Sequence, residues 1–382
     1  MLELESVTIR AGGFLLENIS LTAKKGQCHI IAGPTGSGKT LLLETIIGFM
    51  KPVSGTVSLA GSDLDGVNIE QRRISYVPQD PSVFPHLSVK QNIFYGLKYD
   101  AGNKDPALAL QLARDMKIEH LFDRSSVNLS GGEQQRVVLV RALAPGNRYL
   151  LLDEPFSSLH ESLKKDFWFQ LKELQSRYNL TIIMVTHDFE EAFFMGDTIS
   201  LLINGRIQQT GSPQEIYRNP STLEAARFMG IKNLFAAEVL DIDEQSIRIY
   251  SKDIGSELVV PAGTTPHAKK LVRGEKILAG IRSEEVMIQR SKHRQQHQGN
   301  CIKGTITHIF SKGAMHTIFF SSHNGVGRIE IELPNYALHK LQLSVGDIQV
   351  VLLPGENIFF LKDCDCLTAL TPEETGHHEL SQ

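Results

Sequence analysis

Residues 33–40 read GPTGSGKT, which matches the pattern G-x-x-x-x-G-K-[ST]. The apolar run at 29–32 precedes this loop as an expected strand, and residues 39–50 follow it as an expected helix that ends before Pro52. Glycine lets backbone N–H groups approach a phosphate, because it has no side chain to block them. The stretch therefore predicts a nucleotide phosphate site between a strand and a helix, formed by Gly33, Pro34, Thr35, Gly36, Ser37, Gly38, Lys39 and Thr40.

The end of this loop and a later pair of acids predict a metal site. Lys39 is expected to reach the β- and γ-phosphate oxygens, and the Thr40 hydroxyl to bind Mg²⁺. Asp153 follows the apolar run at 149–152, where a carboxylate can hold Mg²⁺ directly or through water. Glu154 is then placed to polarise an attacking water. The alternative for these two acids is a pair at the start of a helix.

Gln79 and His187 each follow another expected strand, at 74–77 and 181–185. Gln79 is expected to reach both Mg²⁺ and the attacking water. His187 is expected to contact the γ-phosphate and so to sense its presence. A structural role is the alternative for each, since a lone histidine is usually structural.

The pattern of residues 1–235 favours an α/β fold. Alternating apolar residues predict strands at 2–10 and 15–22, and a further strand is expected at 56–60. Residues 81–145 and 163–178 have mostly helical periodicity. Because short apolar strands alternate with helices, we expect a P-loop NTPase core with a parallel sheet, together with antiparallel β and helical subdomains.

After about residue 235 the pattern becomes that of β-structure. GEKILAGIRSEEVMI begins at Gly274 and GDIQVVLLPGENIFF at Gly346, an offset of 346 − 274 = 72 residues, with Gly, acid and apolar residues at matching positions. Chance similarity of two hairpins is one explanation, and a duplicated small β-barrel unit is the one we favour. We expect an all-β, OB-like C-terminal domain with one half at 236–290, the polar linker SKHRQQHQGN at 291–300, a second half at 301–365 and a flexible tail at 366–382.

Composition limits the class of protein. The 382 residues suit two or three domains, and 41% hydrophobic with 21% charged residues are ordinary globular values. A net charge of −4 without a basic block does not suggest a nucleic-acid partner. No apolar run approaches the roughly 18–20 residues of a membrane span, and the acidic N-terminus MLELESVTIR is unlike a signal peptide. The four sparse cysteines predict a reduced cytosolic protein, with a metal shared by Cys364 and Cys366 as an alternative.

A second glycine motif, LSGGE at 129–133, opens the apolar-periodic stretch LSGGEQQRVVLVRAL. The bare N–H groups at such a helix start attract anions. The chain therefore has two motifs that attract phosphate, with one copy of each.

Over residues 1–230 the chain resembles the ATP-binding subunit of an ABC transporter. The resemblance is carried by the order and spacing of GPTGSGKT, Gln79, LSGGE, LLLDEP and His187. The resemblance implies ATP and Mg²⁺ as cofactors, ATP hydrolysis coupled to transport, and a homodimer paired head to tail. It also implies that Phe14 stacks on adenine, with core packing as the alternative. In such a dimer the γ-phosphate held by one subunit is capped by the other subunit's signature residues, Ser130, Gly131, Gly132 and Glu133.

One position departs from the family. Members usually continue the DEP motif with S-A-L-D, and this chain has Ser157-Ser158-Leu159-His160. The family's aspartate helps to link the two sites, so Ser158 and His160 are expected in the inter-subunit loop. The charge of a histidine varies near neutral pH. We expect ATP hydrolysis itself to work, while the sequence leaves the coupling between the two ATP sites undecided.

The resemblance also implies the partners. Without a span of its own, the chain is expected to work with integral membrane permease subunits and an extracytoplasmic solute-binding protein, as a peripheral protein on the cytoplasmic face of the prokaryotic inner membrane. Residues 80–98, DPSVFPHLSVKQNIFYGLK, are expected to receive the permease, although the apolar side chains among them are also suited to a core. The rest of the chain, after residue 230, is similar to the TOBE or Mop-type regulatory region of importers, so we expect import.

The substrate is the least specific inference. Three stretches resemble the ATPases of molybdate/tungstate importers: VPQDPSVFPHLSV, THDFEEAFFMGD and GSPQEIYRNPSTLEAARFMGIKNLF. The ATPases of sulfate, ferric iron, polyamine and sugar importers share much of the same sequence. Mop-type barrels can bind the oxyanion, and a dimerisation module is the other reading of the C-terminal region. A non-transport ABC ATPase is the alternative from a different class. ABC ATPases of chromosomes and DNA repair carry long coiled coils, but this chain has no sustained heptad pattern. Translation factors of this type carry two nucleotide domains in one chain, whereas this chain has one phosphate loop and one signature motif.

Overall fold

The computed structural model describes residues 1–99, 106–157, 159–263, 271–289 and 299–361. The chain divides into two compact units, Met1–Gln214 and Glu215–Gln382, which are described separately below. The domain bounds given above stay predictions. Ser158, the pair Cys364 and Cys366, the tail at 366–382 and most of the linker at 291–300 lie outside the described residues. In the described part of the chain, no helix has the length and apolar character needed to cross a membrane.

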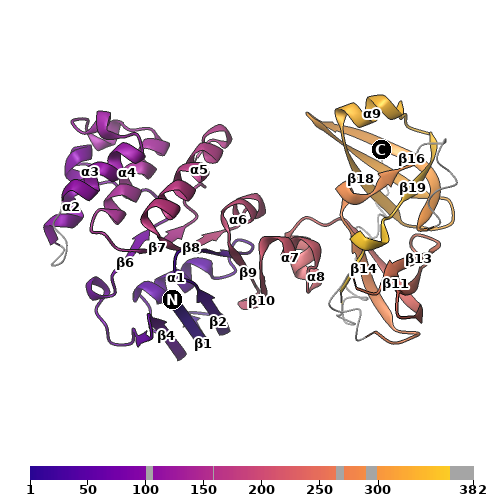
Figure 1. Cartoon of the computed structure of the whole chain (residues 1–382), viewed down its shortest axis with the longest axis horizontal. Helices are drawn as coiled ribbons and strands as arrows, with labels where there is room; N and C mark the ends of the chain where they lie inside the picture. The colour runs from indigo at the N-terminus through magenta and orange to yellow at the C-terminus, as the bar shows by residue number, and fades with distance from the viewer. Residues whose placement is uncertain (100–105, 158, 264–270, 290–298, 362–382) are drawn as a thin grey trace. The chain divides into compact units, whose positions relative to one another are not determined.

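The first unit contains two sheets and the helices that cover them (Figure 1). Its strands are β1 (Leu2–Ala11), β2 (Phe14–Ala23), β3 (Cys28–Ala32), β4 (Ser54–Leu59), β5 (Ser62–Asp63), β6 (Ile74–Val77), β7 (Tyr149–Asp153), β8 (Thr181–Thr186), β9 (Thr198–Ile203) and β10 (Arg206–Gly211). Its helices are α1 (Lys39–Ile47), α2 (Val89–Tyr99), α3 (Pro106–Asp115), α4 (Gly131–Leu143), α5 (Glu161–Tyr178) and α6 (Phe189–Met195), and α7 (Pro213–Arg218) crosses the boundary between the units.

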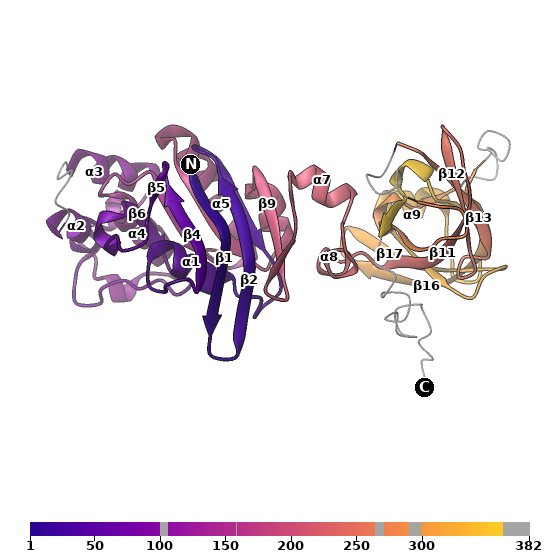
Figure 2. The ribbon, with the colours of Figure 1, turned by 90° about the horizontal axis from the view of Figure 1, so that it is seen from below.

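The larger sheet has the order β10-β9-β3-β8-β7-β6 and is parallel except for β10. Strands β3 and β8 are buried along their whole length, which explains their continuous apolar sequence. The second sheet, β2-β1-β4-β5, is antiparallel, and Figure 2 shows β1, β2 and β4 side by side. Residues of α1 share one core with both sheets. The predicted P-loop core with an antiparallel β part is therefore confirmed.

Helix α1 is shorter than the predicted 39–50. It ends at Ile47 because Gly48 takes φ 101°, the left-handed conformation that terminates helices, and the Gly48 N–H donates to the Glu44 carbonyl. The guanidinium of Arg72 donates to the Ile46 carbonyl at 2.8 Å and to the Leu64 carbonyl at 2.9 Å. These contacts fasten the end of the helix that follows the phosphate loop.

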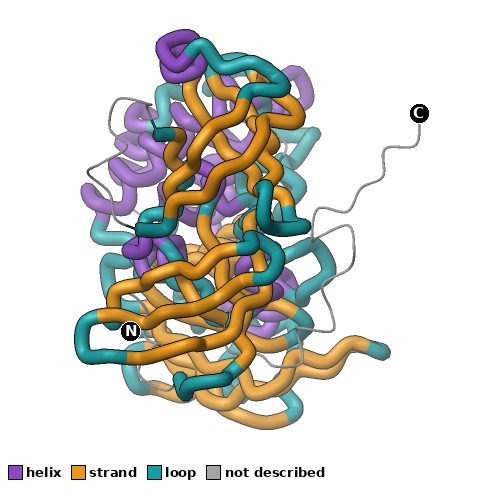
Figure 3. Tube along the Cα trace, turned by 90° about the vertical axis from the view of Figure 1, so that its right-hand side faces the viewer, coloured by secondary structure: helices purple, strands orange, loops and turns teal. Residues whose placement is uncertain are grey.

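The second unit is built mainly from strands, drawn in orange in Figure 3. Its elements after α7 are α8 (Leu223–Phe228), β11 (Asn233–Ile242), β12 (Ser246–Ser251), β13 (Ser256–Pro261), β14 (Lys276–Ile281), β15 (Met287–Ile288), β16 (Cys301–Lys312), β17 (Met315–Ser322), β18 (Arg328–Pro334), α9 (Asn335–Leu341), β19 (Ile348–Leu352) and β20 (Phe359–Leu361). They form two curled five-stranded sheets, β13-β12-β11-β14-β20 and β15-β19-β16-β17-β18, around one hydrophobic core, consistent with an OB-like domain.

The two copies of the repeat complete each other. Each copy folds as a strand, a 3₁₀ turn and a short strand, but the short strand joins the sheet of the other copy. Gly280 of β14 pairs with Phe359 of β20, and the positions 72 residues away, Leu352 and Met287, pair in the same way between β19 and β15. The predicted halves thus exchange their last strands, which gives each sheet one strand from the other half.

Candidate functional site: a nucleotide site at the ends of the parallel strands

The predicted catalytic residues meet at one edge of the parallel sheet. The phosphate loop, residues 33–40, follows β3, and Asp153 ends β7, while Gln79 and His187 follow β6 and β8. These four strands are neighbours in the order β3-β8-β7-β6. Because carboxyl ends of parallel strands lie at the same edge, residues far apart in sequence converge there.

The loop has the shape that its glycines allow. Gly38 has φ 97°, and a Cβ atom there would lie 2.6 Å from the ring of Phe14. A Cβ at Gly33 would lie 2.0 Å from the carbonyl oxygen of Leu202. Side chains are therefore excluded at both positions. Ser37 is 4% exposed, and its hydroxyl has no hydrogen-bond partner within the described residues. A buried hydroxyl without a partner in this loop fits a nucleotide phosphate oxygen.

Lys39 is held at the centre of the site. Its ammonium group donates to the carbonyl oxygens of Gly33 and Pro34, at 2.9 Å each, and lies 3.6 Å from Glu154 Oε1. Burial lowers the pKa of Lys39, and the charges of Glu154 and Asp153 oppose this effect. The ammonium is thus paired with an acid and two carbonyls at the point where a nucleotide phosphate is expected.

Asp153 receives two hydroxyl groups. Thr40 Oγ1 donates to its Oδ1 at 3.1 Å, and the phenol of Tyr76 donates to its Oδ2 at 3.3 Å. Burial raises the pKa of Asp153, and the two hydrogen bonds oppose this effect. A hydroxyl beside a carboxylate is an oxygen donor set that suits Mg²⁺. The sequence reasoning did not identify Tyr76, although its position on the strand next to β7, three residues before Gln79, was a usable signal.

Glu154 links the remaining catalytic candidates. Its Oε2 lies 2.9 Å from Nδ1 of His187 and 3.5 Å from the amide nitrogen of Gln79. Glu154 itself has φ 42°, a left-handed conformation that is uncommon for a residue with a side chain. Such strain is often found at functional sites. The structure therefore brings Lys39, Gln79 and His187 together around one carboxylate.

The signature motif begins helix α4 as expected, but two of its residues are bonded to each other. Ser130 is the N-cap, and its hydroxyl and backbone N–H each lie 2.8 Å from Glu133 Oε2. The hydrogen bond from the Ser130 backbone is the largest influence that lowers the pKa of Glu133. This capping box stabilises the helix start. Any ligand that takes the Ser130 hydroxyl must compete with this carboxylate.

Two further predicted residues lie at the edges of the site. Phe14 is half-buried against Gly38 of the phosphate loop, and it also packs on the core between the sheets. His160 is exposed and is the N-cap of α5, where its Nδ1 accepts from the Ser162 N–H at 3.4 Å. Their roles towards adenine and towards a second subunit stay predictions.

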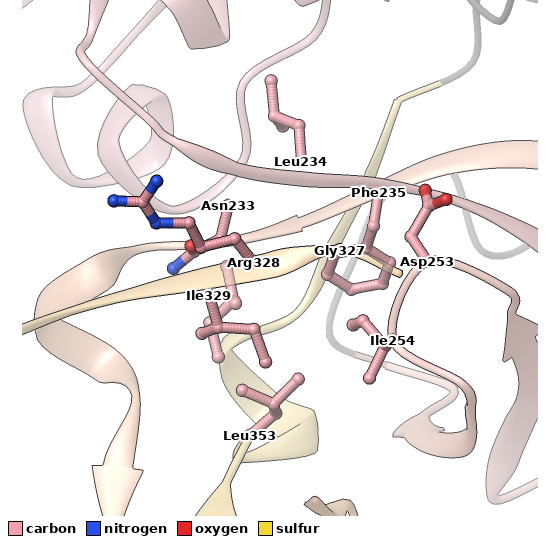
Figure 4. Close-up of a pocket in the computed structure, with 10 residues that line it drawn as sticks. Asn233, Leu234, Phe235, Asp253, Ile254, Gly327, Arg328, Ile329 and Leu353 are labelled. Atoms are coloured by element: carbon pink, nitrogen blue, oxygen red, sulfur yellow. The ribbon is translucent and has the colours of Figure 1, made fainter. Parts of the chain in front are cut away.

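A small pocket lies at the junction of the two sheets of the second unit (Figure 4). Its volume of about 20 Å³ has room for about one water molecule, which is less than a tetrahedral oxyanion requires. Arg328 lies at its edge, and Figure 4 shows the Arg328 guanidinium turned away from Ile254. This guanidinium stacks on Phe319, with Cζ 3.7 Å from the ring centroid. This pocket therefore does not supply a regulatory oxyanion site in the conformation described.

Comparison with known proteins agrees with this geometry. The family model "ABC transporter" matches residues 16–157. The molybdate/tungstate import ATP-binding protein of Pyrococcus horikoshii is 40% identical over 61% of this chain and 68% of its own length. The spermidine/putrescine import ATP-binding protein of Oleidesulfovibrio alaskensis is 43% identical over 57% of this chain and 59% of its own length. The Fe(3+) ions import ATP-binding protein of Escherichia coli O157:H7 is 32% identical over 94% of this chain and 97% of its own length.

Solved structures give the same result over part of the chain. The cbiO1 protein of Clostridium perfringens, part of the ABC transporter complex cbiONQ, is similar with a TM-score of 0.53 and 28% identity over 56% of this chain and 90% of its own. A dimeric ATP-binding cassette in a post-hydrolysis state, bound to ADP and Pi, is similar with a TM-score of 0.50 and 29% identity over 56% of this chain and 99% of its own. The chain therefore belongs to the ATP-binding subunits of ABC transporters, among the ATPases of importers.

Proposed function

We propose that this chain hydrolyses ATP with Mg²⁺ in a head-to-tail homodimer and thereby powers import of molybdate or tungstate through separate membrane permease subunits. The observation that carries the proposal is the convergence of Lys39, Glu154 and His187 at the phosphate loop. A solute-binding protein on the other side of the membrane would deliver the oxyanion. The chain would act at the cytoplasmic face of the membrane.

The proposed roles follow from the contacts. Lys39 and the loop N–H groups bind the β- and γ-phosphates, and Thr40 with Asp153 holds Mg²⁺, which would neutralise phosphate charge when bound. Glu154 orients and polarises the attacking water, and His187 and Gln79 hold Glu154 in position. Ser130, Gly131 and Gly132 of the second subunit cap the γ-phosphate after the Ser130 hydroxyl leaves Glu133.

The head-to-tail site is tested by the variant Glu154→Gln with saturating Mg-ATP. This variant keeps the shape of the side chain but removes the charge that polarises water, so ATP should remain intact between two subunits. We expect a dimer on size exclusion, and a monomer for the control Glu154→Gln/Lys39→Ala, which loses the phosphate contact. A monomer for Glu154→Gln itself would contradict the composite site.

The substrate is supported by the relative from P. horikoshii and by the resemblance of three stretches to oxyanion importers. Import of ferric iron is the second candidate, because the relative named for Fe(3+) matches 94% of this chain, including the second unit. Polyamine import is the third candidate, because relatives named for spermidine/putrescine match between 57% of this chain, in O. alaskensis, and 88% of it, in Pseudomonas aeruginosa.

Elemental analysis of a gene deletion decides between oxyanion import and ferric iron import. Cells without the gene are grown at trace supply, and cell-associated molybdenum, tungsten, iron and sulfur are measured by mass spectrometry. A selective loss of molybdenum or tungsten, restored by the wild-type gene but not by Glu154→Gln, supports oxyanion import. Unchanged molybdenum and tungsten with a loss of iron would transfer the proposal to ferric iron.

A further inference from the structure

Three polar side chains hold the loop at residues 82–88, which we call the docking loop because it lies within the expected permease-docking segment 80–98. Asn92 of α2 and Ser126 are each 0% exposed, and Arg141 is half-buried. Ser126 begins the 3₁₀ turn Ser126–Asn128, just before the signature motif, and Arg141 lies in the last turn of the signature helix α4. The three residues, called the clamp below, therefore come from the turn before α4, from the last turn of α4 and from α2.

Asn92 and Ser126 bind the backbone of the docking loop. Asn92 Oδ1 accepts from the Phe84 N–H at 2.8 Å, and its Nδ2 lies 3.1 Å from the Phe84 carbonyl oxygen. Ser126 Oγ lies 2.8 Å from the Phe84 carbonyl oxygen and 2.9 Å from that of Leu87. Buried backbone groups need such partners. The loop itself adds one bond, from the Leu87 N–H to the Phe84 carbonyl at 3.1 Å, and the side chains of Asn92 and Ser126 supply the others named here.

Arg141 connects the clamp to the aromatic side of the loop. One terminal nitrogen donates to the Ser82 carbonyl at 2.6 Å, and the other donates to Asn92 Oδ1 at 3.2 Å. Its Cζ lies 4.5 Å from the ring centroid of Phe84, so the guanidinium also makes a cation–π contact. Phe84 in turn lies 4.5 Å from the ring of Tyr95, which is 37% exposed.

The docking loop thus has one face that is bonded to α2, to α4 and to the turn before α4, and an exposed face that is available to another protein. Pro85 and His86 are exposed on it, whereas Asn92 and Ser126 are fully enclosed. The backbone adds two bonds, from the Val89 N–H to the Arg124 carbonyl and from the Lys90 N–H to the Phe122 carbonyl, at 3.0 Å each. A displacement of α4 together with the turn before it therefore cannot leave the loop in place without breaking the bonds from Arg141 to Ser82 and from Ser126 to Phe84 and Leu87.

We propose that Asn92, Ser126 and Arg141 are positioning residues that make the docking loop and the signature helix move as one body. The inference rests on the proposed function, in which the signature caps ATP, and on the expectation that residues 80–98 receive the permease. Closely packed, fully bonded elements transmit a displacement instead of absorbing it. Because coupling between two sites is reciprocal, ATP at Ser130 would bias the docking loop, and a bound permease would bias the signature to the same extent.

Hydrogen exchange of the full-length chain tests this link. In the Glu154→Gln background, Mg-ATP should slow amide exchange at 33–40, at 129–133 and at 82–88. Arg141→Met removes the three contacts of the guanidinium while keeping a long side chain. We expect it to retain protection at 33–40 and 129–133 and to reduce the ATP-dependent protection at 82–88 at least about fivefold, the lower end of usual coupling factors. Arg141→Lys, which keeps the charge, should restore part of it.

Two further variants separate the link from general stability. Ser126→Ala removes only one hydroxyl and should also reduce the protection at 82–88. The control Arg114→Met removes an arginine of α3 that pairs at the surface with Glu119 at 3.1 Å, and it should leave all three regions unchanged.

The possible results distinguish the two proposals. Full protection of 82–88 in both Arg141→Met and Ser126→Ala would overturn the clamp. Protection of 129–133 without protection of 82–88 in the parent would overturn the clamp alone. Without protection of 129–133 in the parent, the composite ATP site would fail, and the clamp would fail with it.

Discussion

Nδ1 of His187 lies 2.9 Å from Oε2 of Glu154, although 33 residues separate them in the chain. The residue expected to sense the γ-phosphate is thus bonded to the residue expected to polarise water. Lys39 lies 3.6 Å from the other oxygen of the same carboxylate. A change at the phosphate can therefore reach Glu154 from two sides.

His187→Ala should lower the rate of ATP hydrolysis by about 100-fold or more, because Glu154 loses the partner that orients it. ATP affinity should stay within a few-fold, since Lys39 and the loop are unchanged. Phosphate release and equilibrium nucleotide binding measure the two effects. If the residues act as a unit, Glu154→Gln/His187→Ala should be no slower than Glu154→Gln. If the rate losses of the two single variants multiply in the double variant, Glu154 and His187 act independently and this prediction is wrong.

Tyr76→Phe should weaken metal binding, because the phenol holds Asp153 Oδ2 and leaves the carboxylate in one orientation. Removing such outer partners usually costs about 10- to 100-fold in metal affinity or activity. Mn²⁺ titration of the ATP-bound chain by electron paramagnetic resonance reports the affinity directly. The control is Tyr149→Phe, whose hydroxyl binds only the N-terminal amine among its described contacts. Equal Mn²⁺ affinity in both variants would exclude a role for Tyr76 at the metal.

His160→Asp should leave basal ATPase activity within a few-fold, because His160 lies outside the group around Glu154. It should also stabilise the first unit by roughly 0.5–1 kcal/mol, since aspartate is a strong N-cap and its charge favours the start of α5. Urea unfolding and steady-state hydrolysis test the two expectations. A complete loss of hydrolysis would show that the inter-subunit loop needs histidine for the reaction.

Acid should weaken the first unit through His29. Burial is the main cause that lowers the pKa of this histidine from 6.5 to about 4, and its ring nitrogens are bonded to the Thr22 carbonyl and the Ser200 hydroxyl. The folded state therefore binds the proton less well than the unfolded state. The stability is present above pH 6.5 and is lost as the pH falls towards 4, by about 3 kcal/mol for this single group.

His29→Gln provides the comparison, because glutamine keeps hydrogen-bonding capacity but does not titrate. Urea unfolding at pH 7.0 and at a pH near 5 should show a smaller loss of stability in the variant than in the parent chain. The same loss in both proteins would place the acid sensitivity at other groups.

The sequence contained the strong local signals of the first unit. The glycine pattern at 33–40, the short apolar runs and the acids at their ends predicted the loop, strands β3, β7 and β8 and the residues that meet there. Such signals are local, because a strand needs only its own apolar run and a phosphate loop only its own glycines. Even so, helix α1 ends three residues before the predicted position, where Gly48 adopts φ 101°.

The repeat at Gly274 and Gly346 was also visible in the sequence, but only the tertiary structure decided that its copies exchange their last strands. The bond of the Tyr76 hydroxyl to Asp153 and the contact of Arg141 with the docking loop were likewise decided by the tertiary structure. These contacts join residues more than 50 positions apart, and their geometry depends on which strands become neighbours, in which register, and on how helices pack over them. A single sequence carries the composition of each helix and strand. Which elements become neighbours depends on how all of them pack together in the folded unit.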